Sequence, residues 1–225
     1  VIVSNLWGIR LVEKQSGAAG NVTLRGIKEY DTDKEATVVA TGNGIYGVEG
    51  NVTLGGLTGY NSSSGRGAAG TVSEVIDQGD LKNVMDEYYA GVTDGIYKDL
   101  MAKVKDELKE NSVVVYSSEG AAVKDVKGNV EIYGVREGDA AYYTYSTKLK
   151  GEEGIISSGG DVGVYGAEID VQGSGIEGAG NVTLMKSQLV SWHGYSIRDT
   201  KGKVTVVDSI VESHYVAGGA GISVV

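Results

Sequence analysis

The chain has 225 residues but no cysteine, no proline and no phenylalanine. Without cysteine there can be no disulfides and no thiolate metal sites, although this absence does not fix the cellular compartment. At an average usage of about 5%, a chain of this length would hold about 11 prolines. The joint absence of proline and phenylalanine, beside 14 tyrosines, leaves three explanations: an unusual natural bias, a designed sequence, or phenylalanines read as tyrosine from density.

Positive charge is also scarce. The chain carries 20 Lys and Arg residues against 30 Asp and Glu, which gives a net charge of -10. Binding to nucleic acid or to an anionic membrane requires clustered basic residues, so neither is expected as a partner. No apolar run approaches the roughly 20 residues of a membrane span, so none is predicted.

What the sequence does contain is a repeat. The segment Gly-Asn-Val-Thr-Leu occurs at residues 20–24, 50–54 and 180–184. Aligned with its near-copies, it gives two apolar columns separated by one residue that is usually polar, the period of a strand with one buried face. The first column is Val22, Val52, Val130, Val162, Val182, Val204 and Ile222. The second column is Leu24, Leu54, Ile132, Val164, Leu184, Val206 and Val224.

The repeat has a period of about 20 residues in the C-terminal third, a range typical of stacked architectures. A second apolar signal, as in Gly154-Ile155 and Gly175-Ile176, precedes the columns by about seven residues. One repeat cannot bury its own apolar face, so neighbouring coils must stack. We therefore predict a mainly β fold, a parallel β-helix (solenoid), as a single domain over residues 1–225. The pattern resembles right-handed parallel β-helix repeat proteins, which include pectate-lyase-like enzymes, phage tailspikes and autotransporter passenger domains, and this resemblance implies the right-handed sense.

The repeat is interrupted between Val75 and Ser112. Apolar residues there recur at three-and-four spacing, from Leu81 to Leu108, which predicts one long amphipathic α-helix over about 80–110, within an insertion at about 77–111. A helix of about 30 residues would be about 45 Å long. Because about eight coils at about 4.8 Å span close to 40 Å, we expect the helix to pack along the side of the β-helix.

A β-helix interrupted by one long flanking helix resembles the microbial ice-binding β-solenoid family. The resemblance implies a flat, outward face of short polar residues. The candidate binding face here is Thr23, Thr53, Thr183, Thr205 and Ser223. Glu131 and Gly163 interrupt this column, and a charged side chain in mid-face would hold its own hydration shell. The threonines also have a purely structural explanation, since Thr favours exposed strand faces.

The asparagine of the repeat recurs at Asn21, Asn51, Asn129 and Asn181. Asparagine tolerates turn conformations and can hydrogen-bond from one coil to the next. The sequence therefore predicts a structural asparagine ladder, and repetition accounts for the associated glycosylation sequons.

Aromatic residues offer a second kind of site. Tyr143, Tyr145 and Trp192 are candidates for stacking on sugar rings, and packing against the wall of the fold is the alternative. His193 and His214 lie 21 residues apart, about one coil, but two histidines make a weak metal site. We predict no metal and no cofactor.

Catalytic signals are few. Glu168 and Asp170 fall on one strand face, with Asp208 and Glu212 nearby, and are interpreted as solvated charges. The segment 192–197 partly matches a polygalacturonase motif, but the aspartates required for acid-base chemistry are missing.

The sequence thus predicts a non-catalytic extracellular or cell-surface module whose partner is an ice surface, a carbohydrate or another surface ligand. Ice binding is the most specific expectation. The alternatives are an adhesin or tail-fibre segment, a designed solenoid without evolved activity, and a polysaccharide lyase or hydrolase.

Overall fold

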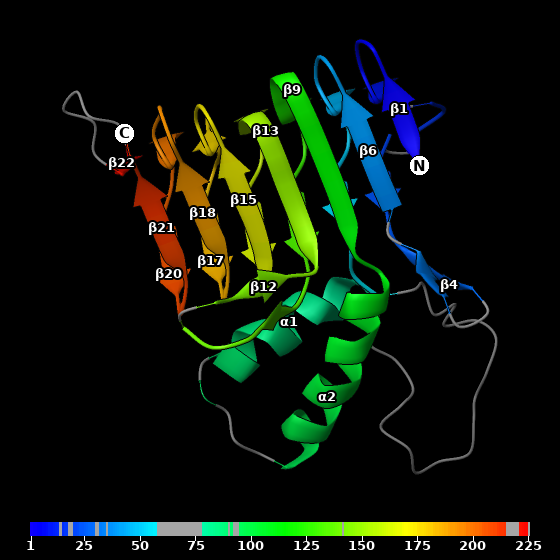
Figure 1. The fold of residues 1–225 in the computed structure, drawn as a ribbon, viewed down its shortest axis with the longest axis vertical. Helices are drawn as coiled ribbons and strands as arrows, with labels where there is room; N and C mark the ends of the chain where they lie inside the picture. Colours follow the sequence, from blue (N-terminus) through cyan, green and yellow to red (C-terminus); the bar gives the residue numbers. More distant parts are fainter. Residues whose placement is uncertain are drawn as a thin grey trace.

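The described part of the chain folds into a mainly β structure with large parallel sheets and two helices (Figure 1). The computed structural model describes residues 1–13, 15–17, 20–29, 32–34, 36–57, 78–89, 91, 95–140, 142–214 and 221–224. The prediction of a mainly β fold built from parallel strands is confirmed.

The larger sheet has 12 strands. Its main row contains β1 (Ile2–Ser4), β6 (Ala36–Ala40), β9 (Val113–Val126), β13 (Thr147–Ser158), β15 (Ala167–Val171), β18 (Gln188–Ser191) and β21 (Ile210–Ser213). The remaining strands are β2 (Ile9–Val12), β7 (Ile45–Val48), β16 (Ile176–Glu177), β19 (Ile197–Thr200) and β22 (Ile222–Val224). The main row runs in chain order from β1 to β21, and the termini lie at opposite ends of it (Figure 1).

The second sheet has six strands, all parallel. In spatial order they are β3 (Val22–Leu24), β8 (Val52–Leu54), β10 (Val130–Tyr133), β14 (Val162–Tyr165), β17 (Val182–Met185) and β20 (Val204–Val207). Spatial order follows sequence order. Two antiparallel pairs complete the strands: β4 (Ile27–Glu29) with β5 (Thr32–Lys34), and β11 (Arg136–Glu137) with β12 (Thr144–Tyr145).

The register of the six-stranded sheet matches the predicted alignment. Val130, for example, pairs with Val52 on one side and Val162 on the other. One assignment is wrong: Ile222 pairs with Ile197 of β19, so β22 and Ser223 belong to the 12-stranded sheet. The segment Ile222-Ser223-Val224 has the same apolar-polar-apolar pattern as the repeat, and pattern alone cannot say which sheet a strand joins.

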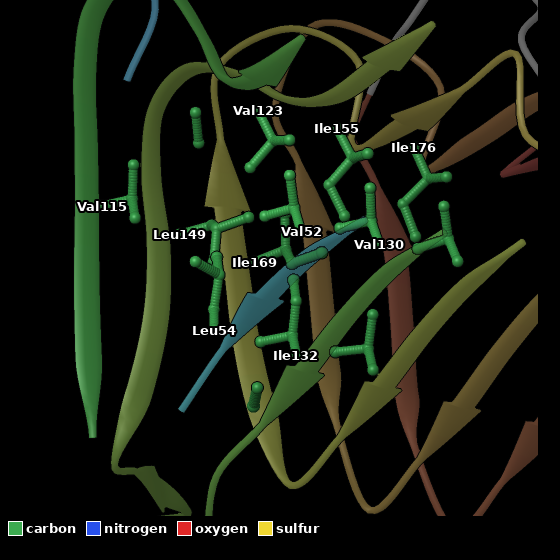
Figure 2. Packing of buried hydrophobic residues seen from close by; sticks show 14 of the residues in the cluster. Val52, Leu54, Val115, Val123, Val130, Ile132, Leu149, Ile155, Ile169 and Ile176 are labelled. Carbon is green, nitrogen blue, oxygen red and sulfur yellow. The ribbon is translucent and has the colours of Figure 1, made fainter. Parts of the chain in front are cut away.

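The hydrophobic core lies between the two sheets. Val52, Leu54, Val130 and Ile132 project from the six-stranded sheet toward residues of the larger sheet such as Ile155 (Figure 2). Because successive side chains of a strand point to opposite faces, the two apolar columns of the repeat enter this core together. The packing becomes incomplete at β20, the last strand of its sheet, where Val206 is 41% exposed.

The predicted asparagine ladder is confirmed. The backbone N–H of Asn51 donates to the Oδ1 atom of Asn21 (2.8 Å), and the N–H of Asn129 donates to Oδ1 of Asn51 (2.9 Å). Asp161 continues the column, since its N–H donates to Oδ1 of Asn129 (3.0 Å) and its own carboxylate accepts from Asn181. Each side chain thus satisfies a turn N–H in the neighbouring repeat.

All large insertions occur at one corner, directly after a strand of the six-stranded sheet. Along the ladder the sequence spacing is 20 or 22 residues in the later repeats, but 30, 78 and 32 residues earlier in the chain. The described residues of these insertions include the β4–β5 pair after β3, the helices after β8, and the β11–β12 pair after β10. Consequently β4, the helices and β12 lie on one side of the molecule, below the long strands in Figure 1.

The prediction of one long helix over 80–110 is wrong, because this segment forms α1 (Gln78–Tyr89) and α2 (Gly95–Glu110). Gly91 lies between them with φ of 81°, a left-handed conformation that ends a helix and that glycine adopts readily. The three-and-four apolar spacing continues across this turn, which explains the error. Among the described residues, neither helix has the length and apolar character needed to cross a membrane.

The helices cover part of the outer face of the six-stranded sheet. Leu81 and Met85 of α1 and Leu108 of α2 pack with Tyr133, Tyr165 and Met185 in a second apolar cluster. Tyr133, Tyr165, Met185 and Val207 are register neighbours on β10, β14, β17 and β20. Helical structure therefore packs against this sheet, but as two separate helices and not as the one long helix that was expected.

Candidate ligand-binding groove

The predicted threonine face is a real column of the six-stranded sheet. Thr23 pairs with Thr53, and Thr183 pairs with Thr205. Glu131 and Gly163 stand between these two pairs, as sequence order had suggested. The column therefore consists of two threonine pairs separated by two other residues, and Ser223 lies outside it.

Two stacked tyrosines explain this interruption. The rings of Tyr133 and Tyr165 lie 5.1 Å apart between centroids, with an angle of 10° between their planes. The Tyr133 hydroxyl donates to Oε2 of Glu131 (2.9 Å). The Tyr165 ring covers Gly163, where an added Cβ atom would lie 2.6 Å from Cε2 of that ring. Glu131 and Gly163 thus occupy the two positions that the side chains of Tyr133 and Tyr165 contact.

Beside the tyrosines lies a polar groove of about 350 Å³. Its walls come from the outer face of β10, β14, β17 and β20, from the asparagine ladder and from α1. The polar lining residues are Lys82, Asn129, Glu131, Asp161, Tyr165, Asn181, Thr183, Lys203 and Thr205. The groove therefore combines cations, carboxylates, amides and hydroxyls on strands that are spaced by about 4.8 Å.

The two carboxylates of the groove are already engaged. Oδ1 of Asp161 accepts hydrogen bonds from both the backbone N–H and the Nδ2 atom of Asn181, at 2.8 and 3.0 Å. These bonds favour the ionised form and lower the pKa of Asp161. Glu131 accepts the Tyr133 hydroxyl, while burial raises the pKa of Tyr133 above its usual range. Both carboxylates that line the groove are thus hydrogen-bonded, and the phenol of the adjacent Tyr133 stays protonated.

Asp86 of α1 lies near the same tyrosines and contributes to raising the pKa values of both phenols. Burial raises the pKa of Asp86 itself, and the nearby Lys82 partly offsets this effect. Within the part of the chain that the structure describes, Oδ1 of Asp86 is buried without a hydrogen-bond partner.

The structure does not bring the predicted sugar-stacking residues together. Tyr145 is buried (4% exposed), and the Tyr143 ring is covered by the Arg136 guanidinium at 4.2 Å. Trp192 follows β18 on the other sheet, where it stacks on His214 with ring centroids 4.5 Å apart. Of the three, only Trp192 is substantially exposed, at 42%.

Other candidate residues are dispersed. Glu168 and Asp170 form ion pairs with Lys148 and Lys150 at 3.5 to 3.8 Å, as expected for charges on a strand face. Asp208 instead pairs with Arg136. The register neighbour of His214 is Trp192, and not His193, because Ser191 pairs with Ser213. Among the described residues, no three His, Asp or Glu side chains are grouped as a metal site would require.

Sequence reasoning missed three parts of the groove. Tyr133 and Tyr165 directly follow the second apolar column. Because they alternate with the core residues, they could have been assigned to the outer face. Asp161 occupies the asparagine position of its repeat, and could have been assigned to the ladder by alignment. Lys82 gave no signal, because its position depends on how α1 crosses the sheet.

Comparison of the chain with protein-family models, curated proteins and solved structures finds no match. The function must therefore be argued from the geometry of the groove.

Proposed function

We propose that the stacked strands form a right-handed parallel β-helix that binds a neutral polysaccharide chain in this groove. The handedness rests on the strong preference of parallel crossovers for the right-handed sense. The observation that supports binding is the lining of the groove, where each of four adjacent strands, with the turn before it, contributes hydroxyl, amide or charged groups. A polysaccharide presents hydroxyl groups at a similar repeated spacing, and Tyr165 adds aromatic surface.

A neutral ligand fits the charge balance. Lys82 and Lys203 provide two positive charges to the groove, and Glu131 and Asp161 provide two negative charges. Neither sign of charge dominates. The carboxylates would therefore repel an anionic polymer, and the lysines would repel a cationic one. Neutral hydroxyls can both donate to carboxylates and accept from lysines. An extracellular or cell-surface location suits such a ligand.

Charged side chains do converge here, the arrangement that a polysaccharide-cleaving enzyme would need. Glycoside hydrolysis uses a protonated acid beside an ionised carboxylate, whose environments drive their pKa values apart. The pKa of Asp161 is lowered and its Oδ1 is bonded to Asn181, so this residue is unsuited to act as the acid. Binding without cleavage is the function that these contacts favour.

Isothermal titration with cellohexaose, a neutral six-residue glucan, tests the proposal. Thr183 and Thr205 are adjacent in the column, and the double variant Thr183→Val/Thr205→Val keeps their shape while removing both hydroxyls. We expect the double variant to bind about tenfold more weakly, since each lost hydrogen bond costs about 0.5–1.5 kcal/mol.

Thr37→Val on β6 is the matched control, because it makes the same change on the other sheet. This variant should bind like the unmodified protein, and no new reducing ends should appear during incubation. Absence of binding by the unmodified protein, or equal weakening by the control, would contradict the proposal.

Ice binding is the second candidate, and the observation that favours it is the adjacency of threonines within each pair of the column. Thermal hysteresis measured on the unmodified protein and on Thr183→Val/Thr205→Val tests it. An ice-binding protein would separate melting and freezing temperatures and lose part of this gap in the variant. No gap at high protein concentration would remove this candidate.

A further inference from the structure

A second cavity, of about 390 Å³, lies between the helices and the corner that follows the six-stranded sheet. No described residue lines both this cavity and the groove. Met85, Leu108 and Val135 give it an apolar wall, and all three are almost completely buried. Tyr88 and Tyr89 add aromatic surface. Its volume and mainly apolar wall are typical of sites for small molecules.

The charged residues that line this cavity are all basic. Lys105, Arg136 and Lys186 line it, and none of its described lining residues is acidic. In a chain with a net charge of -10, three cations around one apolar cavity are unexpected. Arg136 is neutralised by Asp208, with an ion-pair distance of 2.6 Å. Lys105 and Lys186 supply the remaining positive charge.

Lys186 is held in an unusual conformation. Its φ is 46°, in the left-handed region, and the equivalent position one coil earlier is Gly166, also at positive φ. A side chain at such a position is strained. The Lys186 Nζ atom lies 5.0 and 5.1 Å from the ring centroids of Tyr88 and Tyr89, at the wall of the cavity. Burial raises the pKa of Tyr89, so its hydroxyl stays protonated and can donate.

We propose that this cavity binds a small molecule with an apolar body and one carboxylate group. The body occupies the wall formed by Met85, Leu108 and Val135. The carboxylate lies against Lys105 and Lys186. The carboxylate of such a ligand offsets the positive charge of the cavity and gives both lysines a charged partner, which a fully apolar molecule would not do.

Decanoate and its uncharged analogue decanol are the probes, and displacement of the fluorescent dye 1-anilinonaphthalene-8-sulfonate reports their binding. We expect decanoate to bind at least tenfold more tightly than decanol. Lys105→Met and Lys186→Gly should each weaken decanoate binding about tenfold, because a charge-assisted contact is lost, and should leave decanol binding unchanged.

Lys186→Gly suits this test, since glycine relieves the strain at positive φ and is not expected to unfold the chain. Lys150→Met, on the outer face of the 12-stranded sheet, is the control and should bind decanoate normally. Equal affinity for decanoate and decanol, loss of affinity in Lys150→Met, or no displacement of the dye by decanoate would each overturn the proposal.

Discussion

The two faces of the six-stranded sheet show opposite kinds of order. On the inner face, valine recurs in one column of the six strands, and leucine, isoleucine or valine in the other. Most of these side chains pack in one core. On the outer face, the column that begins with Thr23 changes to glutamate and glycine before it returns to threonine. Repetition therefore accounts for the stacking, and departures from repetition create the groove. Substitutions on the two faces should separate these roles.

The largest effect is expected on the inner face. Ile132 is fully buried, and Ile132→Ala would leave a cavity and remove apolar contacts. We expect a loss of about 2–5 kcal/mol in the free energy of unfolding, measured by urea denaturation. Thr183→Ala, on the outer face, should change this free energy by less than about 0.5 kcal/mol. If both variants lost a similar free energy of unfolding, the outer column would also be essential for the stability of the fold.

An intermediate effect is expected where the outer column is interrupted. Gly163→Thr would restore a threonine, but its Cβ atom would lie within 2.6 Å of the Tyr165 ring. We expect it to destabilise the protein by about 1–3 kcal/mol through overpacking, and to weaken cellohexaose binding because the ring must move.

A double-mutant cycle with Tyr165→Leu isolates this clash. If the ring is the cause, Gly163→Thr should cost less in the Tyr165→Leu background, with a coupling of at least 0.5 kcal/mol by the usual range for residues in contact. Additive costs would show that glycine is required at position 163 for another reason.

The features that depend on the repeat could be predicted from the sequence. The pairing of β14 with β10 and β17, the two core columns and the asparagine ladder follow from alignment, because a parallel register places identical positions side by side. The sequence could not predict that Gly91 divides the helix, since the apolar spacing continues past that turn. Nor could it predict the groove, because the positions of Lys82 and of the tyrosine rings depend on how α1 packs across the strands.

The smallest expected effect concerns the ladder, where Asp161 takes the place of asparagine. Hydrogen bonds from Asn181 lower its pKa below the ordinary value of 3.8. A carboxylate with a lowered folded-state pKa contributes stability above about pH 4 and loses it as the pH falls through that pKa. Because Asp161 is exposed, the contribution is small. Asp161→Asn keeps an acceptor for Asn181 but cannot titrate.

Urea denaturation at pH 7 and pH 3 measures this contribution. The unmodified protein and Thr183→Ala should lose the same free energy of unfolding between the two pH values, and Asp161→Asn should lose less. At pH 7 the asparagine variant should be slightly less stable, since it replaces charge-assisted bonds with neutral ones. An identical pH dependence in all three proteins would mean that the ladder at position 161 acts through its geometry and not through its charge, so that the inner and outer faces differ in packing alone.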